Sequence, residues 1–134
     1  VGTGPTQFML EAAQQQPGII VTGRVPDMRP YLADASVIVV PLLQGGGTRF
    51  KILEAFAAGC PVVSTAKGAE GLKVVDGEHL LIRNEVTELV EGVSQIWSEP
   101  SLGKRLAGSA YELVKAEYDW ERVGCNVEEA LQEL

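Results

Sequence analysis

The sequence predicts an α/β domain built on a parallel sheet with helices on both faces. Short runs of valine, isoleucine and leucine alternate with longer segments in which apolar residues recur at helical spacing. The short runs are almost wholly apolar, which is expected for strands that helices cover on both faces. Regular alternation of such strands and helices along one chain is typical of parallel sheets.

In the first half of the chain, proline and glycine separate the expected elements. Phe8, Met9 and Ala12 share one face of a helix, and Pro17–Gly18 ends it. Runs rich in β-branched residues follow, and we expect them to form buried strands. The elements expected here are a helix over Thr6–Gln16, a strand over Ile19–Thr22, a short helix over Met28–Asp34, a strand over Val37–Leu42 and a helix from about Thr48 to Ala58.

The second half repeats the alternation and then becomes helical. Gly59 ends the preceding helix, and an apolar run follows at once. Three glycines in the next eleven residues predict a long loop. The elements expected here are a strand over Pro61–Thr65, a loop over Lys67–Gly77, a strand over His79–Ile82 and helices over Glu85–Ser98, Pro100–Tyr118 and Asp119–Leu134.

Length and composition limit the classes of function. A chain of 134 residues is long enough for one domain with a real core. The formal net charge of −7 argues against a nucleic-acid partner, which would need a basic face. A single histidine excludes a Cys/His zinc site, and we expect no metal. Cys60 and Cys125 are interpreted as small buried side chains in a reducing compartment, with a disulfide as the alternative.

A glycine triplet stands between an expected strand and an expected helix, in the stretch QGGGTRFKILEAFAAGCPVVST. Ligands of parallel sheets bind at such strand-to-helix loops. A helix N-terminus attracts an anion, and glycines let a ligand approach the backbone closely. The loop therefore predicts a diphosphate site, without the Gly-Lys-Ser/Thr of a Walker A motif. A merely flexible connection is the alternative. The site would comprise Gly45, Gly46, Gly47, Thr48 and Arg49.

Glu54 lies six residues after Thr48 on the expected helix. A carboxylate accepts hydrogen bonds in pairs, and the vicinal diol of a ribose offers two donors. Glu54 is therefore a candidate ribose ligand, and an ordinary solvated helix residue is the alternative.

The stretch VTGRVPDMRPYLADASVIVVPLLQGGGTRFKILEAFAAGCPVVSTAKGAEGL resembles the donor-binding half of the GT-B glycosyltransferases of group 1. The similarity lies in a strand ending in proline, a glycine-rich loop, LEA with small residues, and then PVV. It implies that residues 1–134 are one Rossmann-like nucleotide-sugar-binding domain, the C-terminal half of a GT-B fold, truncated at its N-terminus and cut from a longer two-domain chain.

The resemblance also implies roles for single residues. It assigns Glu54 to the ribose of the nucleotide-sugar, while Gly46 stands where the family has a first glutamate that contacts the sugar. Arg24 and Val25 would border the base. On the other side of the donor site, Lys67 and Glu70 are the polar candidates, with ordinary loop polarity as the alternative.

The expected function is transfer of a hexosyl-type group from a nucleotide-diphosphate sugar to an acceptor, with retention and without a cofactor. Catalytic residues are not assigned. The acceptor domain would lie outside this chain, so the isolated chain should be inactive. The alternatives are a non-catalytic nucleotide-binding or scaffolding module and an NAD(P)-dependent oxidoreductase, for which GTGPTQ is a near-match that lacks the third glycine.

The resemblance bears on partners and location as well. The family places two further strands between the ones expected at Ile19–Thr22 and Val37–Leu42. Without them, backbone groups would need other partners. We therefore expect either direct pairing of these two strands or self-association through the sheet. The expected location is cytoplasmic, and peripheral membrane association of the longer parent protein stays open.

Overall fold

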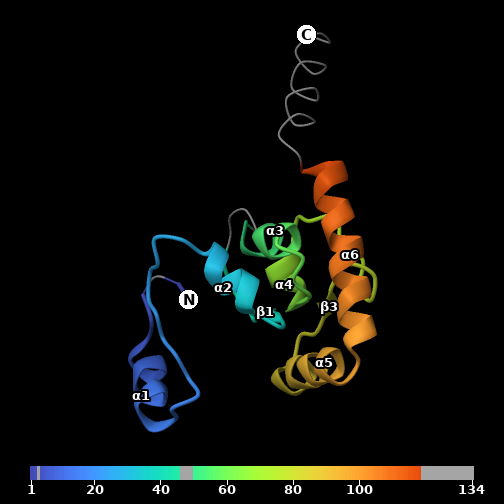
Figure 1. Cartoon of the computed structure of the whole chain (residues 1–134). Coiled ribbons are helices and arrows are strands. Elements are labelled where there is room, and N and C mark those ends of the chain that lie inside the picture. Colours follow the sequence, from blue (N-terminus) through green and yellow to red (C-terminus); the bar gives the residue numbers. More distant parts are fainter. Residues whose placement is uncertain (3, 46–49, 119–134) are drawn as a thin grey trace. The chain divides into compact units, whose positions relative to one another are not determined.

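The computed structural model describes residues 1–2, 4–45 and 50–118 (Figure 1). The chain divides into two compact units, Val1–Tyr31 and a second unit that begins at Leu32. The helix expected over Asp119–Leu134 lies outside the described residues.

The first unit contains the helix α1 (Gln7–Gln15), as the sequence predicts. The Thr6 hydroxyl caps it by accepting a hydrogen bond from the Met9 amide at 3.3 Å. None of its residues is buried, and Phe8 is 78 % exposed. The cap and the local sequence, rather than a core, thus define this helix within the described residues.

The prediction of a strand over Ile19–Thr22 is wrong. These residues form no regular element, and Ile20 is 80 % exposed. A backbone hydrogen bond from the Gly2 amide to the Gly23 carbonyl, 2.9 Å long, is formed nearby. β-Branched residues favour a strand only where a neighbouring strand pairs with the backbone and supports the side chains.

The second unit is organised around a parallel sheet with the strand order β1-β2-β3. The strands are shorter than expected: β1 spans Ile38–Val40, β2 spans Val62–Ser64 and β3 spans Leu81–Ile82. Val39 pairs with Val63, and Val63 pairs with Leu81. Ile19–Thr22 is not one of the strands of the described sheet.

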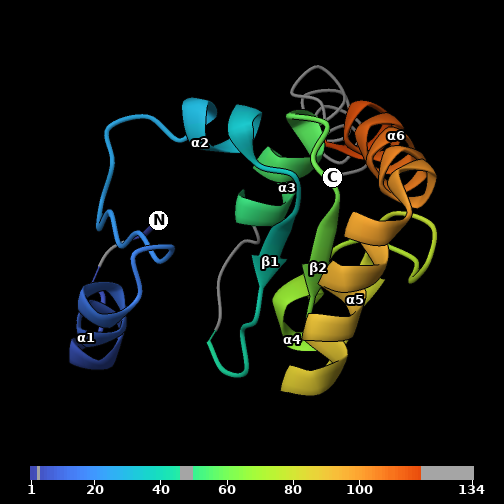
Figure 2. The same ribbon diagram turned by 60° about the horizontal axis from the view of Figure 1, so that its bottom comes forward.

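Helices cover both faces of this sheet, as the apolar strands predict. The helix α3 (Phe50–Ala57) contacts β1 and β2 on one face, and α5 (Val86–Ser98) packs on β2 from the other (Figure 2). The last described helix, α6 (Pro100–Glu117), packs on both α3 and α5. The core on the α5 side consists of Val63, Leu81, Leu89, Ile96, Leu102 and Leu106.

The loop expected over Lys67–Gly77 begins instead with a short helix, α4 (Ala66–Ala69). The Thr65 hydroxyl caps this helix by accepting a hydrogen bond from the Gly68 amide at 2.9 Å. The chain turns after it, and Gly71 and Gly77 have φ values of +85° and +76°, which favour glycine. The glycine content alone predicts a loop here. Because Thr65 caps the segment, its first residues form one helical turn instead.

The helix α2 (Arg29–Asp34) spans the boundary between the two units. The Asp27 carboxylate accepts the Arg29 amide at 2.9 Å and pairs with the Arg29 guanidinium, whose hydrogen bonds hold the pKa of Asp27 below its ordinary value. In the second unit, Cys60 is buried, as expected. Cys125 lies outside the described residues.

Replacing Glu88 by alanine is expected to destabilise the N-terminus of α5. The Glu88 carboxylate accepts the amides of Asn84 at 3.0 Å and Glu85 at 3.2 Å. The hydrogen bond from the Glu85 amide has the largest effect, the one from the Asn84 amide comes next, and both lower the pKa of Glu88. A carboxyl with a lowered folded-state pKa stabilises the fold above its unfolded pKa, and this contribution is lost as the pH falls through the folded value.

Thermal melts from pH 7 to pH 3 should therefore show the largest difference between Glu88→Ala and the unaltered chain at neutral pH. The difference should shrink below about pH 4.3, the ordinary range of a glutamate. Glu91→Ala, an exposed carboxylate on the same helix, is the control and should change little. A difference that stays constant over the whole pH range would contradict the capping role.

Candidate functional site

The candidate site is the edge of the sheet at which the strands end. Because the three strands are parallel, their carboxyl ends meet at this edge. Figure 2 shows β1 and β2 pointing the same way, with the chain after β1 and the helix α4 beyond their ends. The described segment Leu42–Gly45 follows β1, Thr65 follows β2, and Arg83 follows β3. Such edges are where ligands bind in open parallel sheets.

Two buried hydroxyl groups join the segments at this edge. Thr65 is 2 % exposed, and its hydroxyl donates a hydrogen bond to the Leu42 carbonyl. The Ser64 side chain is fully buried, with its hydroxyl 3.2 Å from the Val40 carbonyl oxygen. The chain leaving β1 is thus tied to the chain leaving β2 by side chains as well as by the ladder.

The helix α4 and the residue after it place two predicted residues at this edge. Lys67 and Glu70 form an ion pair with 2.6 Å between the ammonium nitrogen and the carboxylate oxygen. Their side chains are 38 % and 58 % exposed, so this pair contributes little stability, about 0–1 kcal/mol. The Asn84 side-chain oxygen accepts the Ala66 amide at 2.9 Å, which links α4 to the chain after β3.

Among the residues predicted to bind diphosphate, Gly45 lies at the carboxyl edge, where its φ of +120° requires a glycine. The remaining members, residues 46–49, lie outside the described part of the chain. Glu54 lies on α3, on the exposed side of a helix whose other side carries Ala55 and Phe56 in the core. The exposed Glu54 carboxylate is accessible to a ligand, and its exposure also fits an ordinary solvated side chain.

The predicted base-side residues belong to the first unit. Arg24 is exposed, and Val25 is half-buried. The structure therefore groups Gly45, Glu54, Lys67 and Glu70 in one unit and leaves Arg24 and Val25 in the other.

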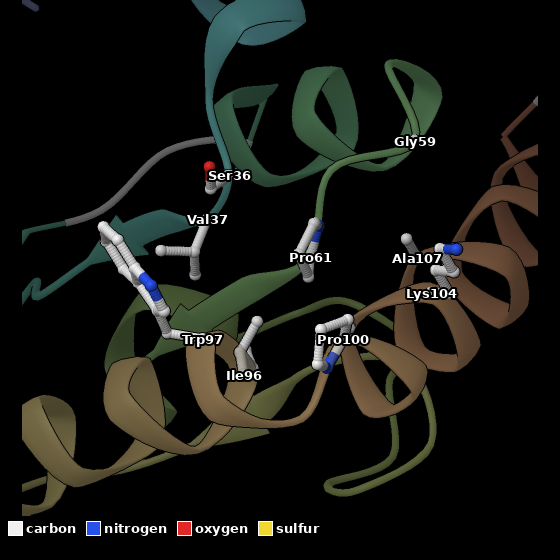
Figure 3. Close-up of a pocket in the computed structure, with 10 residues that line it drawn as sticks. Ser36, Val37, Gly59, Pro61, Ile96, Trp97, Pro100, Lys104 and Ala107 are labelled. Atoms are coloured by element: carbon white, nitrogen blue, oxygen red, sulfur yellow. The ribbon is translucent and has the colours of Figure 1, made fainter.

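A cavity of about 400 Å³ lies at the opposite, amino end of the strands (Figure 3). Val37 and Pro61, which precede β1 and β2, line it together with Ile96 and Trp97 of α5. The glycine loop predicts a polar cleft at the N-terminus of the helix that follows it, with Glu54 facing that cleft. This cavity is a different one, because neither Gly45 nor Glu54 lines it and its walls are mostly apolar.

Neither a reactive thiol nor a metal centre is evident in the described residues. The Cys60 thiol donates a hydrogen bond to the Leu32 carbonyl at 2.9 Å, and burial raises its pKa, so it stays protonated at neutral pH. No group of three or more His, Cys, Asp or Glu side chains gathers around a metal position in residues 1–2, 4–45 and 50–118.

The fold defines the class of protein as an α/β domain with a parallel sheet between helices. Comparison with known families is more specific, since the model of "Glycosyl transferases group 1" matches residues 1–99. The chain therefore belongs to the group 1 glycosyltransferases, and its fold fits the C-terminal domain of a GT-B enzyme.

Similar proteins agree with this assignment. An uncharacterized 44.6 kDa protein in the cps region of Klebsiella pneumoniae is 30% identical over 87 residues, which are 65% of this chain and 22% of that protein. Sucrose-phosphate synthase from Thermosynechococcus elongatus superposes with a TM-score of 0.78 at 21% identity, over 95% of this chain and 33% of that one.

The C-terminal domain of the group 1 glycosyl transferase LpcC from Francisella tularensis superposes with a TM-score of 0.72 at 22% identity, over 85% of this chain and 60% of that one. The chain thus spans about a fifth to three fifths of the proteins to which it is similar. In the part of the chain that the structure describes, no helix is both long and apolar enough to cross a membrane.

Sequence reasoning missed Ser64, Thr65 and Gly68, which organise the carboxyl edge. A signal was present, because threonine is one of the residues preferred at a helix N-cap. The apolar run predicts Thr65 only as the end of a strand, and the hydrogen bond from its hydroxyl to the Leu42 carbonyl depends on a residue 23 positions away.

Proposed function

We propose that the chain is the donor-binding domain of a glycosyltransferase that transfers a hexosyl group from a nucleotide-diphosphate sugar to an acceptor with retention. The observation that carries this proposal is the position of the glycine loop, which begins at the carboxyl end of β1 and leads into α3. Membership of the group 1 family supports it, and it favours group transfer over dinucleotide-dependent oxidation.

The proposed roles follow from the chemistry of each group. Backbone amides at a helix N-terminus and an arginine suit the charge of a diphosphate. A carboxylate suits the two hydroxyls of ribose. The proposed diphosphate ligands are Gly45, Gly46, Gly47, Thr48 and Arg49, the ribose ligand is Glu54, the base-side residues are Arg24 and Val25, and the sugar-side residues are Lys67 and Glu70.

The proposal needs neither a metal nor a cofactor, and it places the protein in the cytoplasm. It assigns the acceptor to a domain outside these 134 residues. Half of the surface that would enclose the donor is then absent, so the chain should bind a nucleoside diphosphate only weakly, and it should transfer no sugar by itself.

Gly46 supports a second candidate, a nucleotide-binding module without transferase activity. It stands where the resemblance places a glutamate that contacts the sugar. An assay of sugar transfer by a longer protein that contains this chain separates the two candidates, because only a transferase turns over the donor.

The site itself is tested by titrating the chain with UDP, GDP and ADP and with their nucleosides, using ligand-observed NMR. Glu54→Ala should weaken binding of both kinds of ligand by about 1–3 kcal/mol, since a hydrogen-bonded carboxylate is removed from the ribose. Arg49→Ala should weaken binding of the diphosphate more than binding of its nucleoside, because its partner is charge.

Two variants control for the loss of charge alone. Glu91→Ala removes an exposed carboxylate from α5, and Lys104→Ala removes an ammonium beside the cavity at the amino end of the sheet. Both should bind as the unaltered chain does. Unchanged affinities in Glu54→Ala and Arg49→Ala would show that these residues do not bind the donor. Sugar transfer by the 134-residue chain would show that the acceptor does not need a domain outside this chain.

A further inference from the structure

One hydroxyl group at the carboxyl edge joins two segments that the proposed donor site uses. The Thr65 side chain accepts a hydrogen bond from the Gly68 amide at 2.9 Å, inside α4. The same hydroxyl donates to the Leu42 carbonyl, which lies past the end of β1. A hydroxyl has one proton to donate and lone pairs to accept, so both bonds form at once.

The surroundings leave Thr65 little freedom to make other contacts. The residue is 2 % exposed, and Ser64 next to it is fully buried. The Val40 carbonyl oxygen accepts the Thr65 amide at 3.3 Å, and the Ser64 hydroxyl lies 3.2 Å from the same oxygen. Buried polar groups need partners, and each of these groups has an acceptor within hydrogen-bond distance, since the Ser64 hydroxyl also lies 3.0 Å from the Thr65 carbonyl oxygen.

Gly68 makes the close approach of α4 to the strand ends feasible. A Cβ atom on Gly68 would lie 2.3 Å from the Ser64 hydroxyl oxygen and 2.9 Å from the Val40 carbonyl oxygen. Any other residue at this position would push α4 away from β1. The hydrogen bond between Thr65 and Leu42 therefore depends on the absence of a side chain at position 68.

The two joined segments carry different parts of the proposed site. Leu42 lies three residues before Gly45, the described start of the glycine loop. The helix α4 carries Lys67, and Glu70 directly follows its last residue. Because Leu42 is beyond the β1–β2 ladder, the ladder itself does not set the direction of its carbonyl group.

We propose that Thr65 is a positioning residue of the donor site. Its hydroxyl holds the chain that leaves β1 and the N-terminus of α4 in a constant relation, so that Gly45 and the sugar-side residues lie on the same side of one nucleotide-diphosphate sugar. This inference rests on the proposed function. It adds a residue that acts through its neighbours and does not touch the donor.

The test compares Thr65→Val, which keeps the shape of the side chain and removes both hydrogen bonds, with Thr65→Ser, which keeps the hydroxyl. Amide hydrogen exchange of the 134-residue chain is measured first, without any ligand. Exchange at residues 43–45 should rise in Thr65→Val and return toward the unaltered rate in Thr65→Ser. Unchanged exchange at these residues in Thr65→Val would overturn the proposal.

The nucleoside diphosphate that binds best among UDP, GDP and ADP is then titrated beside its nucleoside. Loss of a hydrogen-bonded positioning group should weaken diphosphate binding about fivefold in Thr65→Val and leave the nucleoside within about twofold. Thr65→Ser should restore the affinity. The control is Ile96→Val, which removes one methylene from the core beside the amino end of the sheet and should lower the melting temperature without this selective loss.

The possible results separate this inference from the function on which it rests. If the unaltered chain binds none of the three diphosphates, the proposed function fails, while raised exchange in Thr65→Val still upholds the hydroxyl link. If the chain binds and Thr65→Val binds equally well, Thr65 is a helix cap only and the positioning role is overturned. An equal loss in Ile96→Val would assign the effect to stability and would likewise overturn it.

Discussion

Phe56→Ala is expected to lower the free energy of unfolding by about 3–5 kcal/mol, because it deletes a whole aromatic ring from the core. Phe56 is fully buried on α3, the helix that packs on both β1 and β2 and on α6. A domain of this size has a total stability of about 5–15 kcal/mol, so the variant should be largely unfolded or close to it near physiological temperature.

The same helix offers a matched control. Phe50 lies six positions earlier and is 63 % exposed. Phe50→Ala removes the same ring from a largely solvated position and should change the stability by only about 0.5 kcal/mol. Urea denaturation followed by circular dichroism measures both variants. Similar losses in the two would contradict the orientation of α3 in the core.

Gly68→Ala is expected to destabilise the fold by about 1–3 kcal/mol, because it overpacks the carboxyl edge of the sheet. The Ser64 side chain can rotate to relieve part of the clash with the new methyl group. The Val40 carbonyl oxygen, 2.9 Å from the position of that methyl group, belongs to the backbone of β1 and cannot rotate away. The cost should therefore persist after relaxation.

Gly108→Ala tests whether this cost is specific to close packing. Gly108 lies within α6, is exposed, and has open space where a Cβ would stand. Alanine at an open helix position is favoured over glycine by about 0.5–1 kcal/mol, so this variant should be more stable. Thermal melts of both variants should shift in opposite directions. A shift of the same sign would contradict the packing described around Gly68.

Local patterns predicted most of the elements. Apolar runs around Ile38–Val40 and Val62–Ser64 have no other stable place than the interior of a sheet, and they form β1 and β2. Helical spacing, together with proline and glycine at the ends of elements, located α1, α3, α5 and α6 to within a few residues. These signals act over one or two turns of chain, so the sequence alone contains them.

The wrong predictions concern features that need a distant partner. Ile19–Thr22 has the composition of a strand and forms none in the described structure. The helix α4 replaces the start of an expected loop because Thr65 caps it. The Thr65 hydroxyl in turn donates a hydrogen bond to the carbonyl of Leu42, which follows β1. Composition describes what a segment prefers, whereas pairing and packing decide whether that preference is realised.

For the candidate site, the sequence by itself determined that a glycine loop stands between a buried strand and a helix, and parallel-sheet geometry then assigns it to the carboxyl edge. Gly45 lies at that edge. Only the tertiary structure decided that Ser64, Thr65 and Gly68 tie this edge together and that the cavity lies at the opposite end. The physical reason is distance along the chain: the contacts of Ser64 with Val40 and of Thr65 with Leu42 join residues 24 and 23 positions apart, and no local pattern encodes which of them will meet.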